Sequence, residues 1–147
     1  MKEFHGRVLF AGTYKGKAMV SHAGFNTLAS FQKSCLNAGA KKVIVSDQNN
    51  KDLFGKNITG VALCLPQTIG STTGGMVIQT VASRGLSPAA WLFSKEIDPL
   101  AASGITLARV WNHVPLIAID NLGDDFLATV KEGDEIEIKE DGTVIVY

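Results

Sequence analysis

An unbroken apolar run at residues 61–65, Val-Ala-Leu-Cys-Leu, constrains the fold most. It shows no alternation of polar and apolar residues, which is typical of a strand buried on both faces. Pro66 ends the run, a small polar loop follows over residues 67–75, and apolar residues 76–83 predict a helix. A fully buried strand that leads into a helix favours an α/β domain with layers on both sides of a sheet.

The remaining pattern continues this alternation of strands and helices. Residues 26–38 predict a helix that begins at the N-cap Asn26 and stops at Gly39. An Asp-Gly pair at residues 141–142 predicts a closing hairpin between residues 134–139 and 143–147. Further strands are predicted at 7–10, 17–20, 42–46, 89–93 and 114–119. Gly12 and Gly16 are predicted to bracket the turn between the first two of these strands. Short helical turns are predicted at 99–103 and 126–130.

Together these elements predict a single mixed α/β domain over residues 1–147, with a mixed sheet or small barrel and flanking helices. The charges balance, with 14 Lys plus Arg against 14 Asp plus Glu, so nothing favours nucleic acid or an anionic membrane as partner. The apolar stretches are far shorter than the roughly 20 residues that a membrane-spanning helix needs. The polar N-terminus lacks a signal-peptide core, so we expect a cytoplasmic protein.

No metal site is expected on this chain. Cys35 and Cys64 lie far apart and form no paired motif, so both are expected to be free, buried thiols. The histidines, at positions 5, 22 and 113, are equally scattered, and no set of ligands for iron or zinc emerges from the sequence.

The loop before the second predicted helix is the candidate site. A buried strand that runs into Gly70-Ser71-Thr72-Thr73-Gly74-Gly75 and then a helix directs hydroxyls and backbone N–H groups at one point. The helix dipole is positive there, which favours a carboxylate or phosphate. Gly74 and Gly75 cost roughly 1 kcal/mol each in a helix, which indicates close approach of a ligand or of a neighbouring helix. Plain capping by Ser71 or Thr72 is the alternative, and the two interpretations stay open.

Three well-known loops do not fit. The glycine spacing of a P-loop is present, but Met76 stands where the phosphate-binding lysine belongs. No Gly-x-Gly-x-x-Gly spacing occurs, which excludes a dinucleotide fingerprint. A phosphohistidine swivelling domain needs a histidine in the loop, and none lies between His22 and His113.

The loop resembles that of another family. Gly70-Ser71-Thr72-Thr73-Gly74 is similar to the Gly-Ser-Ser-Thr-Gly loop of aconitase X small subunits and, more distantly, to the Gly-Ser-Ser-Arg loop of the aconitase swivelling domain. Residues 53–60 resemble the family's Leu-Tyr-Gly-Lys-Ser-Ile-Thr-Gly segment. Weaker similarities lie at 6–8, 16–18, 87–90, 97–99 and 114–117, in the family's order. The sequence departs from the family pattern at Lys15, at Thr72 and in the long segment 26–42. The length of that segment favours a bacterial-type member of the family.

The resemblance implies the swivelling β/β/α fold and a function. It implies a small subunit, inactive alone, of a heterodimeric hydro-lyase that dehydrates a hydroxy acid, with the iron or iron–sulfur centre on the large subunit. Ser71 would be the catalytic base, and Gly70, Thr72, Thr73 and Gly74 would bind the substrate, although the two threonines suit helix capping equally. Known substrates of the family are cis-3-hydroxy-L-proline and 5-phosphomevalonate. We expect the former, because no cluster of Arg or Lys adjoins the loop to hold a phosphate.

A serine acts as a base only where its alkoxide is stabilised, by helix N–H groups and by a cation. Lys56 is the better local candidate for that cation, with an exposed turn lysine as the alternative, whereas Arg84 ends the same helix and is too distant. A non-catalytic anion-binding or assembly module of the same fold remains a second hypothesis for the whole chain.

Overall fold

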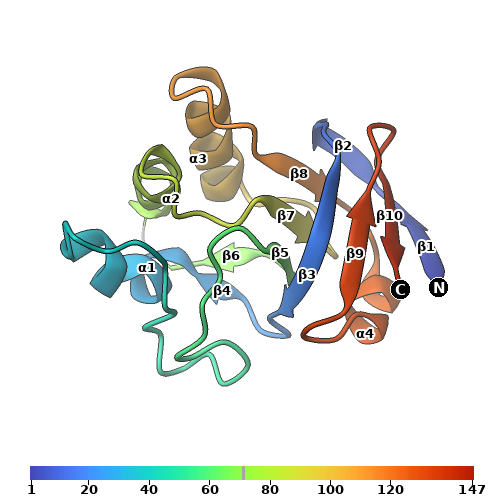
Figure 1. Cartoon of the computed structure of the whole chain (residues 1–147), viewed down its shortest axis with the longest axis horizontal. Helices are drawn as coiled ribbons and strands as arrows, with labels where there is room; N and C mark the ends of the chain where they lie inside the picture. Colours follow the sequence, from blue (N-terminus) through green and yellow to red (C-terminus); the bar gives the residue numbers. More distant parts are fainter. Residues whose placement is uncertain (71) are drawn as a thin grey trace.

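A strongly curved mixed sheet organises this computed structural model, which describes residues 1–70 and 72–147 (Figure 1). The eight-stranded sheet has the order β1-β10-β9-β3-β5-β7-β8-β2. The strands are β1 (Lys2–His5), β2 (Arg7–Phe10), β3 (Tyr14–Val20), β5 (Ala62–Leu65), β7 (Ala90–Phe93), β8 (Ile117–Asp120), β9 (Glu135–Ile138) and β10 (Thr143–Val146).

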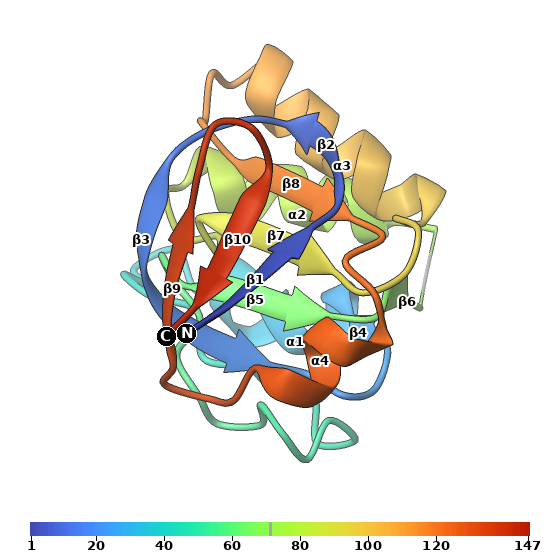
Figure 2. The ribbon, with the colours of Figure 1, turned by 90° about the vertical axis from the view of Figure 1, so that its right-hand side faces the viewer.

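The centre of the sheet is parallel and its flanks are antiparallel. Strands β3, β5, β7 and β8 run parallel, whereas β2, β9, β10 and β1 join them through antiparallel pairs. The two ends of the strand order, β1 and β2, are consecutive in the chain with only Gly6 between them. The sheet therefore curls until it nearly closes, with β1, β9 and β10 facing β5 and β7 (Figure 2).

Helices cover the sheet unequally. Helices α1 (Thr27–Leu36), α2 (Gly74–Ser83) and α3 (Pro99–Val110) lie side by side against one face, whereas α4 (Asp124–Thr129) lies near the chain termini (Figure 1). Within the described part of the chain, none of the helices has the length and apolar character to cross a membrane.

The alternation along β5 explains the unbroken apolar run. Leu63 and Leu65 point into the core under α1–α3, whereas Ala62 and Cys64 point into the interior of the curled sheet. All four side chains are fully buried, as the sequence predicted. The neighbouring strand β7 repeats the arrangement, with Trp91 and Phe93 on the first face and Ala90 and Leu92 on the second.

Several sequence predictions are confirmed. Asn26 is the N-cap of α1, and its Oδ1 accepts a hydrogen bond of 3.1 Å from the backbone N–H of Ala29. The hairpin β9–β10 turns at Gly142, whose φ of 91° suits glycine. The expected fold class, a mixed sheet or small barrel with flanking helices, is also confirmed.

Others are wrong for identifiable reasons. Gly16 lies inside β3 instead of in a turn, because the strand starts at Tyr14 to pair with β9. The polar N-terminus forms edge strand β1, in which only Phe4 is buried. Residues 42–46 form no strand beyond an isolated bridge from Ile44 to Asn57, because their backbone N–H groups bond to loop and helix atoms instead.

The third helix is much longer than the short turn predicted at 99–103. It spans 12 residues, and small or apolar side chains on its buried face (Ala101, Gly104, Ile105 and Ala108) pack on the core. Gly104 discourages a helix by propensity, and tertiary packing overrides that preference.

Candidate functional site

The candidate loop lies beyond the carboxyl ends of the parallel strands. A short parallel pair, β4 (Phe25–Asn26) and β6 (Thr68–Ile69), carries the chain from β3 into α1 and from β5 towards α2. The arrows of β5, β7 and β8 all point to this edge in Figure 2. Ligands of open α/β sheets bind at such an edge, because the loops that follow neighbouring strands meet there.

Gly70 leads the chain out of β6 directly over the start of α1. Its φ is 112°, and a side-chain Cβ at this position would lie 2.7 Å from Oδ1 of Asn26. Because Asn26 Oδ1 already caps α1, the loop and the first turn of α1 are held in contact. Gly70 is therefore required by the local geometry, whether or not a ligand binds.

Asp98 anchors the strand before the loop. Its Oδ1 accepts a hydrogen bond of 2.8 Å from the backbone N–H of Thr68, and its Oδ2 accepts one of 2.5 Å from the Thr68 hydroxyl. Oδ2 also accepts a bond of 3.1 Å from Ala101 N–H, so Asp98 is the N-cap of α3. An Asp before Pro99 is a typical helix start, so the local sequence carries this signal.

Gly74 and Gly75 allow α2 to pack closely between its neighbours. A Cβ on Gly74 would lie 2.7 Å from Oγ1 of Thr27 in α1. A Cβ on Gly75 would lie 2.7 Å from Ser103 Oγ and 3.1 Å from the Leu100 carbonyl oxygen in α3. Of the two explanations that the sequence offered for these glycines, packing against neighbouring helices accounts for both. The case for an anion therefore rests on the hydroxyls and the helix terminus alone.

Three of the predicted substrate-binding residues, Thr72, Thr73 and Gly74, lie at the N-terminal end of α2. Thr72 and Thr73 are exposed, and Gly74 is buried. Thr73 is the N-cap of α2 through its backbone, with its carbonyl oxygen 3.1 Å from Val77 N, and its side chain makes no capping hydrogen bond. Ser71, the predicted base, lies outside the described residues. Exposed hydroxyls at a helix N-terminus suit the binding of a carboxylate or phosphate oxygen.

The arginines of the chain are all engaged within it. Arg7 forms a bidentate pair with buried Asp120, with Nε–Oδ1 at 2.9 Å and Nη2–Oδ2 at 2.6 Å. The hydrogen bond and charge of Asp120 raise the pKa of Arg7. Arg84 donates to the carbonyl oxygens of Ser34, Cys35 and Asn37 at the end of α1, and Arg109 donates to those of Ala11 and Leu116.

Lys56, the predicted cationic neighbour of the loop, has a carboxylate partner elsewhere. Its Nζ lies 2.6 Å from Oε2 of Glu132. Both residues line a hollow of about 420 Å³ that is also lined by His22 and Asp52, and none of residues 67–70 and 72–75 lines it. The local cation that the sequence suggested for Ser71 is therefore already paired with a residue that follows α4.

The thiols and other donor groups do not fit an iron centre. Cys64 is fully buried, and burial raises the pKa of its thiol. Cys35 is free but only half-buried, which differs from the buried thiol expected at that position. Its partial burial still raises the pKa of its thiol. Across residues 1–70 and 72–147, no three His, Cys, Asp or Glu side chains come together as metal ligands.

Comparison with known proteins decides the family. A family model described as the aconitase X swivel domain matches residues 3–147. The chain belongs to the aconitase X swivel domain family. The resemblance drawn from the loop and the segments around it is thereby confirmed.

Curated relatives of this aconitase X swivel domain include small subunits from archaea. The phosphomevalonate dehydratase small subunit of Methanocella arvoryzae is 29% identical over 141 residues, which cover 96% of this chain and 94% of the relative. The protein of the same name from Methanocaldococcus jannaschii is 29% identical, with 92% and 90% covered.

Solved structures show the same fold. The crystal structure of aconitase X from Thermococcus kodakaraensis superposes with a TM-score of 0.80 at 23% identity, covering 100% of this chain and 99% of that one. A solution NMR structure of a UPF0107 protein gives a TM-score of 0.77 at 22% identity, with 99% of each chain covered.

Proposed function

We propose that this swivel domain is the small subunit of an aconitase X-type hydro-lyase and contributes half of a composite active site. The observation that best supports this proposal is the match of the family model to residues 3–147. The chain also covers at least 90% of two relatives that are named as small subunits. The enzyme would act on a small hydroxy acid in the cytoplasm, as a heterodimer or a higher assembly with a large subunit.

Ser71 is the proposed base. In such a dehydration, a C–H bond next to a carbonyl or carboxyl group breaks, its proton passes to the base, and hydroxide leaves from the neighbouring carbon. The first-turn N–H groups of α2 face the loop and would stabilise the serine alkoxide, while the hydroxyls of Thr72 and Thr73 and the backbone of Gly70 and Gly74 bind the substrate carboxylate.

The large subunit would supply the rest. Every arginine of this chain is engaged with groups of its own fold, and Lys56 is paired with Glu132. A cation beside Ser71 would therefore come from the partner. The iron or iron–sulfur centre would also belong to the large subunit, where it would accept the leaving oxygen.

Two substrates are proposed for testing. The names of the curated relatives favour phosphomevalonate, which the sequence had placed second. The engagement of the arginines within the fold favours cis-3-hydroxy-L-proline, which carries no phosphate. The relatives match over nearly their whole length, so we rank phosphomevalonate first.

The test is an assay of the co-expressed small and large subunits on both substrates. We expect Ser71→Ala to lower kcat at least about 10²-fold, the usual minimum for loss of a general base. Ser83→Ala, at the opposite end of α2, is the matched control and should retain full activity, because its exposed hydroxyl bonds to the Thr80 carbonyl oxygen of the same helix. Activity of Ser71→Ala within a few-fold of wild type would remove Ser71 as the base and favour a non-catalytic module, and activity without a large subunit would refute the composite site.

A further inference from the structure

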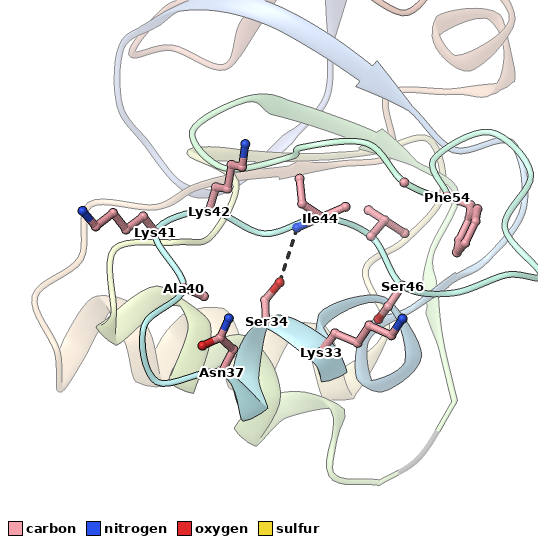
Figure 3. A pocket seen from close by; sticks show the side chains of 11 residues that line it. Lys33, Ser34, Asn37, Ala40, Lys41, Lys42, Ile44, Ser46 and Phe54 are labelled. Atoms are coloured by element: carbon pink, nitrogen blue, oxygen red, sulfur yellow. Dashed lines mark hydrogen bonds between the residues drawn. The ribbon is translucent and has the colours of Figure 1, made fainter.

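A hollow with a basic rim lies away from the candidate loop, between the C-terminal half of α1 and residues 40–46 (Figure 3). Its volume is about 370 Å³. Apolar groups form much of its lining, among them Ala40, Ile44 and Phe54. In Figure 3, the Phe54 side chain lies at one end of the hollow, and Phe54 is 49% exposed. We refer to this hollow as the lysine groove.

Three exposed lysines, Lys33, Lys41 and Lys42, line the groove, and no carboxylate does. Within residues 1–70 and 72–147, none of the three forms a salt bridge, whereas Lys17 and Lys56 pair with Glu135 and Glu132. The chain as a whole has no net charge. The groove is therefore a local excess of positive charge beside exposed apolar surface.

The arrangement of these lysines indicates an extended ligand. In Figure 3, Lys41 and Lys42 lie at one end of the groove, and Lys33 lies near Ser46 at the other. Their side chains diverge, so they do not converge on one point as the donors around a single small anion do. Charges spread along an apolar channel instead match a peptide segment that carries both apolar and acidic side chains.

The groove is connected to the candidate loop through α1. At its start, the N-cap Asn26 contacts Gly70. At its end, Arg84 from the C-terminus of α2 donates to the carbonyl oxygens of Ser34, at 3.0 Å, and Asn37, at 2.8 Å. Ser34 and Asn37 also line the groove. A partner bound there would contact α1, whose N-terminus lies against the loop and whose C-terminal end is joined to α2 through Arg84.

We propose that the lysine groove docks an acidic, amphipathic segment of the large subunit. This inference rests on the proposed function, because it takes the large subunit as the partner. The groove recruits that subunit and takes no part in the chemistry at Ser71. Its loss therefore weakens assembly and leaves the rate of the assembled enzyme unchanged.

The test titrates small subunit into a fixed amount of large subunit and measures dehydratase rate. For K33E/K41E/K42E, we expect the concentration that gives half-maximal rate to rise at least about tenfold, with an unchanged maximal rate and a weaker dependence on salt. K33Q/K41Q/K42Q should give a smaller rise, and it keeps the test valid if the charge-reversed variant folds poorly. K2E/K15E/K139E changes the charge equally near the β9–β10 hairpin and should behave like wild type.

Failure of this inference differs from failure of the proposed function. If Ser71 is the base, Ser71→Ala lowers the maximal rate but does not change the small-subunit concentration that gives half-maximal rate. A wild-type pair that neither assembles nor dehydrates would overturn both proposals. If the pair works but the groove variants assemble like wild type, the groove proposal alone is overturned.

Zero-length carbodiimide cross-linking of the complex provides a second measurement. It should join Lys33, Lys41 or Lys42 to Asp or Glu residues of one large-subunit segment. Lysines that stay accessible to acetylation in the complex would contradict the proposal. So would saturable binding of inorganic pyrophosphate to the groove in the isolated small subunit without any effect on assembly.

Discussion

Gly75 and Gly104 meet backbone to backbone where α2 packs on α3, and a Cβ on Gly104 would lie 2.6 Å from the Gly75 carbonyl oxygen and 2.9 Å from its Cα. The same Cβ would lie 2.9 Å from Cβ of Ile78, a fully buried core residue. Backbone atoms cannot move aside as a flexible side chain can. This contact therefore fixes how closely the helix that starts at the candidate loop approaches its neighbour.

Gly104→Ala should destabilise the protein. Overpacking typically costs about 1–3 kcal/mol, and the clash with backbone atoms favours the upper part of that range, which exceeds the roughly 1 kcal/mol that alanine contributes to helix propensity. Urea denaturation should show a net loss of free energy of unfolding. Gly39→Ala is the control, because the nearest atom to a Cβ there is 3.6 Å away and contact is ordinary. Equal stability of Gly104→Ala and wild type would show that the two helices separate without cost.

Asp98→Ala should weaken the attachment of β6 to α3. The substitution removes an N-cap, usually worth about 0.5–2 kcal/mol, together with two hydrogen bonds to Thr68. We expect a total loss of roughly 2–3 kcal/mol in the free energy of unfolding. Thr68→Val removes only the hydroxyl bond and should cost less than Asp98→Ala. The reverse order would mean that capping by Asp98 contributes little.

Arg7→Ala should leave a buried carboxylate without its main partner. Asp120 is fully buried, and besides Arg7 it accepts a hydrogen bond of 2.8 Å from Ile97 N–H. Loss of one member of an ion pair is destabilising when the other member is buried, and the effect is reduced here because Arg7 itself is half exposed. Arg7→Lys should recover only part of the stability, because lysine lacks the bidentate geometry. A double-mutant cycle with Asp120→Asn measures the coupling, and a coupling near zero would contradict this role.

Cys64 should make the protein less stable at alkaline pH. Burial raises the pKa of its thiol in the folded state, so the unfolded chain ionises first, near pH 8.5. Its contribution to stability is thus complete below that pH and declines above it, by about 1.4 kcal/mol per pH unit.

Urea denaturation from pH 7 to pH 10 provides the measurement. The slope between pH 9 and 10 should be smaller in Cys64→Ala than in wild type. Cys35→Ala should change the slope less, because that thiol is only half-buried. Identical slopes in wild type and Cys64→Ala would show that ionisation of Cys64 does not cause the loss of stability at alkaline pH.

Elements that are determined by residues adjacent in the sequence were predictable. The apolar pattern of β5, the side-chain cap at Asn26 and the Asp-Gly hairpin each follow from local rules. The strand β1 was missed because a half-polar edge strand has little apolar pattern to reveal it. The extent of α3 was missed because its glycine signals a helix end by propensity, whereas packing on α2 stabilises the continued helix.

Some features of the candidate site were likewise predictable from the sequence, and others were not. The sequence by itself determined the loop, its hydroxyls, the helix behind it and the family, because these are properties of consecutive residues. Only the tertiary structure decided that Gly74 and Gly75 serve helix packing, that Asp98 anchors β6, and that Lys56 pairs with Glu132. Those assignments join residues far apart in the chain, and their contacts are set by strand register and helix approach, which no local pattern encodes.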